Sequence, residues 1–189
     1  MKKKILATVL AAALAFSSVI PAVPLNNQTT TAEAAKKKQP SVKKIRKAIA
    51  DKYGDEYMPD VSLTTSEIDE RLGIKSSWYL DILAQVPMIS TQANTLVIVK
   101  AKNKNTKKKV KKQLLAYREQ QINDTMQYPM NIPKVQASRV YVKDNYVFFI
   151  MLGFIDSSLE ETENEEQLIE AYKTENKKAV DAINALFKE

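Results

Sequence analysis

The sequence contains no cysteine and no histidine in its 189 residues. Without cysteine the chain cannot form disulfides, so its stability has to come from an ordinary hydrophobic core. Without histidine and cysteine it can build neither a Ser-His-Asp or Cys-His catalytic arrangement nor a zinc site of His and Cys ligands. We therefore expect no catalytic residue, no cofactor and no metal, and we interpret the protein as a non-enzyme.

The first 34 residues have the pattern of a secretory signal peptide. Lys2 to Lys4 precede an apolar run from Ile5 to Phe16, and Ala32-Glu33-Ala34-Ala35 offers the small-x-small pattern of a cleavage site. The run is much shorter than the roughly 20 apolar residues that a membrane-spanning helix needs. We expect a secreted or extracytoplasmic protein that is associated with the cell envelope and, because it lacks cysteine, carries no lipid anchor.

Positive charge is concentrated directly behind the predicted cleavage site. The chain has a formal net charge of +7, yet residues 48–189 sum to −2, because residues 36–47 hold seven basic residues and no acidic one. We interpret 35–40 as a basic linker and 41–189 as a single domain. The basic leader suits an anionic wall polymer or a membrane surface, or it is simply solvated, and another envelope protein is the other candidate partner. Because the domain itself is nearly neutral, we expect no nucleic-acid partner.

Hydrophobic periodicity and turn residues predict the elements of this domain. Helices are expected at 42–53, from 65 to Gly73, at 107–123 and from 168 to 187, and residues 58–63 are expected to be extended. Strands are expected within 82–89 and at 95–101, 134–142 and 146–152, with an ordered loop at 128–133.

The strand at 95–101 (TLVIVKA) is apolar on both faces, so we expect both faces to be covered. Residues 146–152 are the most apolar run behind the signal peptide and should form a central strand. The predicted fold is α+β. It has a four-stranded, mostly antiparallel sheet in the order β-β-α-β-β-α, with helices packed on one face and an extra N-terminal helix.

Several strand-core motifs resemble those of one known family. They are Gln85-Val-Pro-Met-Ile-Ser90, Asn94 to Ala101, Tyr128-Pro129 and Ala137 to Ile150. The chain resembles the family of domain of unknown function 4358, found in secreted proteins and lipoproteins of Gram-positive, mainly clostridial, bacteria, over roughly residues 75–155. The resemblance implies an exported α+β domain and brings no catalytic residue, because the family has no established activity. Many members carry a lipid-attachment cysteine, which this chain lacks.

Two sets of side chains are candidates for binding. A recognition surface is predicted from loop and strand-edge residues with polar tips on apolar bodies: Trp78, Tyr79, Pro87, Met88, Gln127, Tyr128, Pro129 and Asn131. An anion-binding patch is predicted from the lysines at the start of the third long helix: Lys104, Lys107, Lys108, Lys109, Lys111 and Lys112. The plainer alternatives are that the first set closes the end of the sheet and that the second is a solvated face. The lysines have no interleaved aromatic residues, so binding of single-stranded nucleic acid is unsupported.

These observations favour a secreted, non-enzymatic module that binds a cell-envelope component or a protein partner. The acidic run at 156–166 lacks the glycine and the alternating spacing of an EF-hand loop, so we do not expect calcium there. Two alternatives stay open. One is an envelope hydrolase or another enzyme that uses carboxylate or lysine chemistry, and the other is a small-molecule carrier with a buried pocket.

Overall fold

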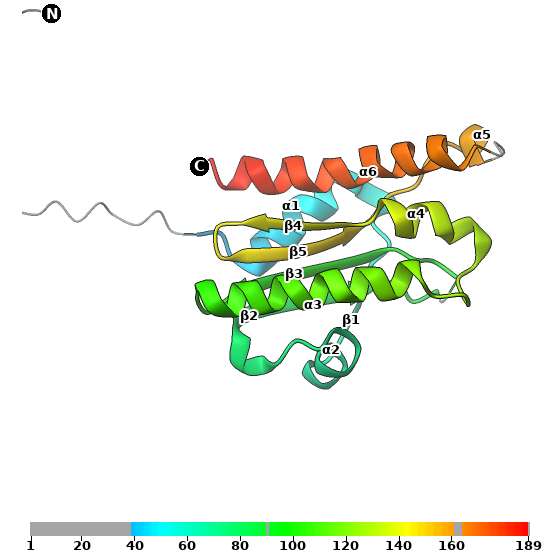
Figure 1. Cartoon of the computed structure of the whole chain (residues 1–189). Helices are drawn as coiled ribbons and strands as arrows, with labels where there is room; N and C mark the ends of the chain where they lie inside the picture. The colour runs from blue at the N-terminus through cyan, green and yellow to red at the C-terminus, as the bar shows by residue number, and fades with distance from the viewer. Residues whose placement is uncertain (1–38, 90, 161–163, 189) are drawn as a thin grey trace, which may run out of the picture. The chain divides into compact units, whose positions relative to one another are not determined.

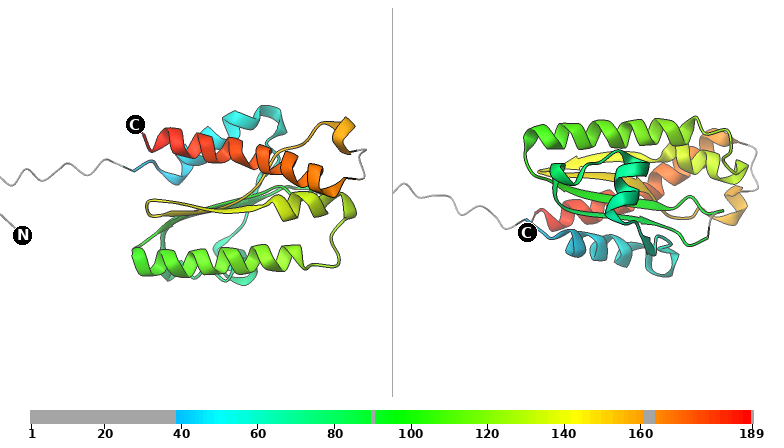
Figure 2. Two further views of the ribbon diagram at one scale, coloured as in Figure 1. Left: turned by 45° about the horizontal axis from the view of Figure 1, so that its top comes forward. Right: turned by 90° about the horizontal axis from the view of Figure 1, so that it is seen from below.

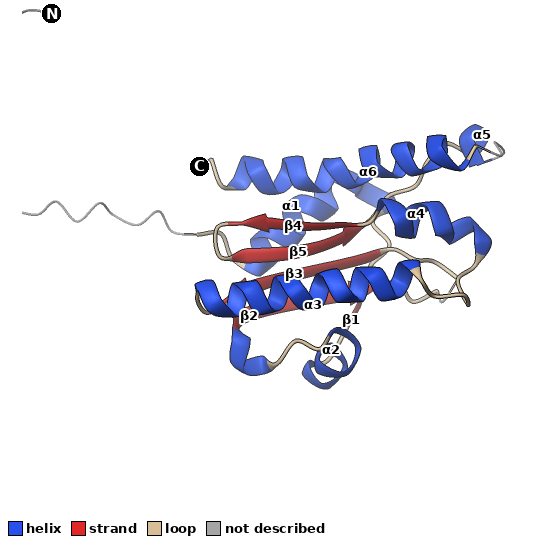
Figure 3. Ribbon diagram, in the orientation of Figure 1, coloured by secondary structure: helices blue, strands red, loops and turns tan. Residues whose placement is uncertain are grey.

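A five-stranded antiparallel sheet forms the centre of the molecule (Figures 1 and 3). The structure is a computed structural model that describes residues 39–89, 91–160 and 164–188, so the predicted signal peptide and most of the basic linker lie outside the described residues. The strands are β1 (Val61–Ser62), β2 (Tyr79–Val86), β3 (Thr95–Ala101), β4 (Arg139–Lys143) and β5 (Tyr146–Met151). They lie in the order β1-β2-β3-β5-β4, and every neighbouring pair is antiparallel.

Helices cover both faces of this sheet, as Figure 2 shows. The α-helices of the described residues are α1 (Val42–Tyr53), α2 (Thr65–Leu72), α3 (Lys104–Ile122), α4 (Ile132–Ala137), α5 (Ser157–Glu160) and α6 (Glu165–Leu186). One half of the core joins α1 and α6 to one face of β3 and β5, through Leu96, Ile98 and Phe148 among others. The other half joins α2, α3 and α4 to the opposite face, through Val97, Val99 and Phe149 among others.

The prediction of a four-stranded sheet with helices on one face is therefore wrong in both details, although the α+β class is confirmed. The fifth strand is β1, two residues of the segment that the sequence marks only as extended. Helices are needed on both faces because all six residues of β5 and six of the seven in β3 are buried, and alternate residues of a strand point to opposite faces.

The ends of several elements also differ from their predicted positions. Residues 134–137 are predicted as the start of a strand but belong to α4, and the strand β4 begins at Arg139. The second strand starts at Tyr79 and ends before Pro87, which lacks the backbone N–H that would continue the ladder. Helix α3 starts at Lys104, because Asn103 accepts hydrogen bonds from the Asn105 and Thr106 amides and caps it.

Polar side chains hold the layers together at a few buried points. Asn176 of α6 is 1% exposed; its Oδ1 accepts from the Leu152 amide at 2.9 Å and its Nδ2 donates to the Ala137 carbonyl at 3.0 Å. Elsewhere in the domain, Gln85 of β2 accepts from Arg46 Nε of α1 at 3.1 Å and from the Tyr57 hydroxyl at 3.0 Å. These contacts fix α6, α4 and α1 relative to the sheet.

Asn176→Leu tests the first of these contacts. The change keeps the branched shape and the number of heavy atoms of the side chain but leaves a buried N–H and a buried C=O unpaired, so we expect a loss of about 3 kcal/mol in the free energy of unfolding. Urea denaturation measures it. The control is Lys177→Ala, which removes an exposed ion pair with Asp181 and should cost less than about 0.5 kcal/mol. Equal losses for the two variants would contradict the role of Asn176.

The partly buried Tyr57 predicts how stability depends on alkaline pH. Burial raises the pKa of Tyr57 to about 12, against the opposing effect of Arg46 beside it. An unfolded tyrosine ionises near pH 10, so the unfolded state loses its proton first and stability should fall as the pH rises from about 10 to about 12. In Tyr57→Phe this fall should be shallower, while the slope between pH 7 and 9 stays unchanged. Denaturant unfolding at successive pH values gives both slopes, and an identical fall above pH 10 in both proteins would refute the assignment.

Candidate functional site

The predicted recognition surface is divided between the two ends of the sheet. At one end of the sheet, β2 and β5 finish and β3 begins, and we call this the pocket end. Six of the eight residues lie there, after β2 or after α3: Pro87, Met88, Gln127, Tyr128, Pro129 and Asn131. The opposite end, where β3 finishes and β5 begins, we call the lysine end. Trp78 and Tyr79 lie at the lysine end, where Tyr79 pairs with Ala101. The eight residues therefore do not form one surface.

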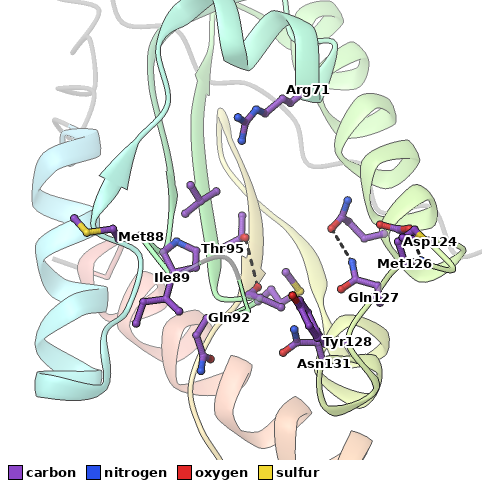
Figure 4. A pocket seen from close by; sticks show the side chains of 15 residues that line it. Arg71, Met88, Ile89, Gln92, Thr95, Asp124, Met126, Gln127, Tyr128 and Asn131 are labelled. Atoms are coloured by element: carbon purple, nitrogen blue, oxygen red, sulfur yellow. Dashed lines mark hydrogen bonds between the residues drawn. The ribbon is translucent and has the colours of Figure 1, made fainter.

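A pocket of about 420 Å³ opens at the pocket end (Figure 4). The loop after β2 forms one side with Met88 and Ile89, and the segment after α3 forms the other with Gln127 and Tyr128. Thr95 lies between them at the start of β3. Five predicted residues line this pocket, since Pro129 lines only the neighbouring one.

Carboxamide side chains dominate the polar part of the lining. Gln92, Gln121, Gln127 and Asn131 all contribute to it. Asn131, which is 6% exposed, donates to the Thr91 carbonyl at 2.9 Å and so ties the two sides of the pocket together. Each carboxamide presents both a donor and an acceptor, which suits a partner with amide or hydroxyl groups.

The pocket contains one positive and one negative side chain, and they come from different elements. Arg71 enters from α2, and its guanidinium also pairs with Glu67 at 3.5 Å. Asp124 lies on the far side, where its Oδ1 accepts from the Met126 amide at 2.9 Å. Since the two charges are opposite and each has a protein partner, the pocket has no strong preference for an anion or a cation.

Exposed apolar side chains form the rim. Met88 is 76% exposed, Ile89 54% and Met126 86%. We call this site the methionine-rimmed pocket. Solvated methionines on a surface are an unfavourable arrangement unless something covers them, because each exposes an apolar chain that burial would stabilise by about 1.5–3 kcal/mol.

A second pocket, of about 560 Å³, adjoins the first and shares Gln92 and Asn131 with it. Its lining is largely apolar and includes Phe154 and Tyr172. Lys134 of α4 is 2% exposed there, and its Nζ lies 4.5 Å from the centre of the Phe154 ring and 5.1 Å from that of Tyr172. Cation–π contacts of this kind attract an ammonium group to the faces of the two rings.

The predicted anion-binding patch lies at the lysine end, over the first half of α3. Lys104, Lys108, Lys109, Lys111 and Lys112 are exposed there. Lys107 is partly buried and donates to the Asp144 carbonyl in the β4–β5 turn at 2.6 Å. The patch is therefore separate from the methionine-rimmed pocket.

Among residues 39–89, 91–160 and 164–188, no group of three or more acidic side chains is placed to hold a metal ion. Within the same ranges, no helix is both long enough and apolar enough to cross a membrane.

Sequence reasoning missed several residues of the pocket: Arg71, Gln92, Thr95, Gln121, Asp124 and Met126. They come from α2, β3, α3 and two loops, so no local spacing connects them. Met126 carried a usable signal, because an apolar residue in the polar stretch 123–127 has no helix face or strand to explain it.

Comparison with known proteins identifies a family model that matches the chain. The family model described as a domain of unknown function (DUF4358) matches residues 52–152, just over half of the chain, from the end of α1 to the residue after β5. The match agrees with the resemblance of the strand motifs and extends it toward the N-terminus. No curated protein and no solved structure matches the chain.

The contact between Asn131 and Thr91 predicts how the pocket is held open. Asn131→Ala removes the donor, so we expect a loss of about 1 kcal/mol in the free energy of unfolding and faster amide hydrogen exchange in residues 87–94. Hydrogen exchange followed by mass spectrometry measures the second effect. Gln127→Ala is the control, because its hydrogen bond to Gln121 is long, at 3.4 Å, and should leave that loop unchanged.

Proposed function

The chain belongs to the DUF4358 family, and we propose that it is an extracytoplasmic, non-enzymatic module that binds a protein partner at the methionine-rimmed pocket. The location outside the cytoplasm rests on the signal-peptide pattern of residues 1–34. The binding role rests on the distribution of exposed apolar side chains.

That distribution is the observation that carries the proposal. Ten large hydrophobic side chains are exposed among the described residues, and six belong to the two segments that flank the pockets: Met88, Ile89, Met126, Tyr128, Met130 and Ile132. Single exposed apolar residues are ordinary, but a gathered set is typical of protein–protein interfaces. Methionine and tyrosine are also enriched in such interfaces.

The carboxamide lining and the apolar rim of the pocket favour a peptide segment as the bound element. The carboxamides of Gln92, Gln121 and Gln127 can pair with backbone N–H and C=O groups, and the apolar rim can hold the side chains beside them. A small-molecule site usually buries most of its ligand. Met88 and Met126 are more than three-quarters exposed, so they stand out from the surface and would contact a larger body.

Photo-crosslinking tests the proposal. A benzoylphenylalanine in place of Met126, in protein secreted by the natural host, should give a discrete adduct with one envelope protein. The same group in place of Leu115, which is exposed at 45% on α3, is the matched control and should give none. Gel electrophoresis and mass spectrometry identify the adducts.

A second variant tests whether the adduct depends on the apolar rim of the pocket. Adding Met88→Asp to the Met126-labelled protein should abolish the adduct, because a charge would enter the apolar rim. Adducts with glycan or lipid alone, adducts of equal strength from both label positions, or the absence of any adduct from position 126 would each overturn the proposal.

A further inference from the structure

The lysine end of the domain collects basic residues from segments that are far apart in the sequence. Lys102 and the lysines of α3 follow β3, and Lys143 ends β4 where it pairs with Tyr146. Lys43 lies in the first turn of α1. That turn is held at this end because the Tyr146 hydroxyl donates to the Pro40 carbonyl at 2.5 Å. Figure 1 shows the start of α3, the β4–β5 turn and the beginning of α1 on the same side.

The lysines of α3 make no ion pair among the described residues, whereas several lysines elsewhere in the domain do. Elsewhere Lys47 pairs with Asp51 at 2.7 Å and Lys177 with Asp181 at 2.5 Å. Among the described residues, no lysine from 102 to 112 makes an ion pair. Their charge also faces the positive end of the α3 dipole, which is unfavourable. Asp81, which pairs with Lys100, and Asp144 of the β4–β5 turn also lie at this end, but the lysines outnumber them. This excess of positive charge indicates an anionic partner.

Acidic residues gather at the other end of the molecule. Asp60 accepts from the Met88 amide and Asp124 lines the methionine-rimmed pocket, while Glu165 begins α6 beside Gln136 of α4. The 19 residues of α3 separate the two ends by about 28 Å. This is more than three times the Debye length of about 8 Å at physiological salt, so an external surface senses each end separately.

Apolar groups accompany the lysines at this end. Leu80 is 63% exposed and lies in an irregular step of β2, between the pairings of Tyr79 and Asp81. Trp78, two residues earlier, is half-buried against the core and lies beneath Lys109, whose Nζ is 5.4 Å from the ring centre. Lysines around an exposed leucine and a tryptophan are typical of surfaces that bind at the headgroup level of a bilayer.

We propose that the lysine end docks on an anionic phospholipid bilayer, with Leu80 and Trp78 at the headgroup level, and thereby points the methionine-rimmed pocket away from the membrane. The proposal goes beyond the protein-binding function, because it depends on the opposite end of the domain.

The chemistry of the patch favours a bilayer over a soluble polyanion. Every basic residue from 100 to 112 is lysine, which attracts phosphate as a point charge and lacks the bidentate geometry that arginine uses to recognise individual groups. The lysines cover an end of the domain from three segments rather than following one groove. An exposed leucine gains nothing from a hydrophilic polymer, whereas a bilayer can bury it.

Vesicle sedimentation tests the docking. Residues 38–189 form one compact unit that contains both halves of the core, so this segment is used as the folded protein. We expect it to bind vesicles of phosphatidylcholine with 30 mol% phosphatidylglycerol, a composition of our choosing, and not vesicles of phosphatidylcholine alone. Changing Lys104, Lys108, Lys111 and Lys112 to glutamine should weaken binding by about 100-fold or more.

A charge-matched control separates this patch from net charge. Changing Lys47, Lys52, Lys173 and Lys177 to glutamine removes the same charge from exposed sites outside the patch and should leave binding nearly unchanged. Thermal unfolding shows that both variants are folded. No preference of the unchanged protein for anionic vesicles, or equal losses in the two variants, would refute the proposal.

Leu80→Ser distinguishes a bilayer from a polymer. It should weaken binding to vesicles about tenfold and leave binding to soluble polyphosphate unchanged, because only the bilayer can bury the leucine. Unchanged vesicle binding in this variant would assign the patch to a polyanion instead and would overturn the bilayer proposal.

The absence of cysteine makes the orientation directly measurable. A bimane label on Ser77→Cys, beside Trp78, should become protected from iodide quenching when vesicles bind. The same label on Met126→Cys should stay accessible. The opposite pattern would refute the orientation, and neither label depends on whether a protein partner occupies the pocket.

Discussion

The burial of β3 and β5 on both faces is the constraint on which the rest of the structure depends. From Thr95 to Val99 and from Tyr146 to Met151, no residue is more than 6% exposed. Such strands cannot leave either face in water, so α1 and α6 must cover one and α2, α3 and α4 the other. The antiparallel pairing of Thr95 with Met151 through Lys100 with Tyr146 then sets which residues face each layer.

The same pairing produces two chemically different ends. One collects the loop after β2, the exit of β5 and the segment after α3, and so builds the methionine-rimmed pocket. The other collects the start of α3, the β4–β5 turn and the start of α1, and so gathers lysines. Buried polar contacts keep these segments in place: Arg118 of α3 donates to the Gln136 and Ser138 carbonyls at 2.6 and 2.8 Å, which fixes the exit of α4. The pocket and the lysines therefore lie on separate surfaces of the domain.

Residue patterns predicted the regular elements well where a local signal existed. Helix α1 begins after the Ser41 cap and ends before Gly54, and β3 spans the whole TLVIVKA run. Asp144, which has a φ of 49°, lies in the tight turn between β4 and β5. The patterns failed where helix and strand were both possible. Residues 134–137 are predicted as the beginning of a strand, but they form helix α4. Arg118 and Asn176 donate hydrogen bonds to the Gln136 and Ala137 carbonyls at the end of this helix. Six of the eight candidate recognition residues lie together at the pocket end. The sequence could identify them because they belong to loops with an unusual composition of apolar and carboxamide residues.

The sequence by itself determined most of the long helices, the core strands and the family, because helix caps, alternating burial and glycine stops act over a few neighbouring residues. It also excluded the kinds of site that need cysteine or histidine, because folding cannot supply a residue type that the chain does not contain. Only the tertiary structure decided which side chains meet. Arg71, Thr95 and Asp124 share a pocket, and Trp78 lies under Lys109 rather than near Tyr128, because strand register and helix packing bring together residues that no spacing along the chain connects.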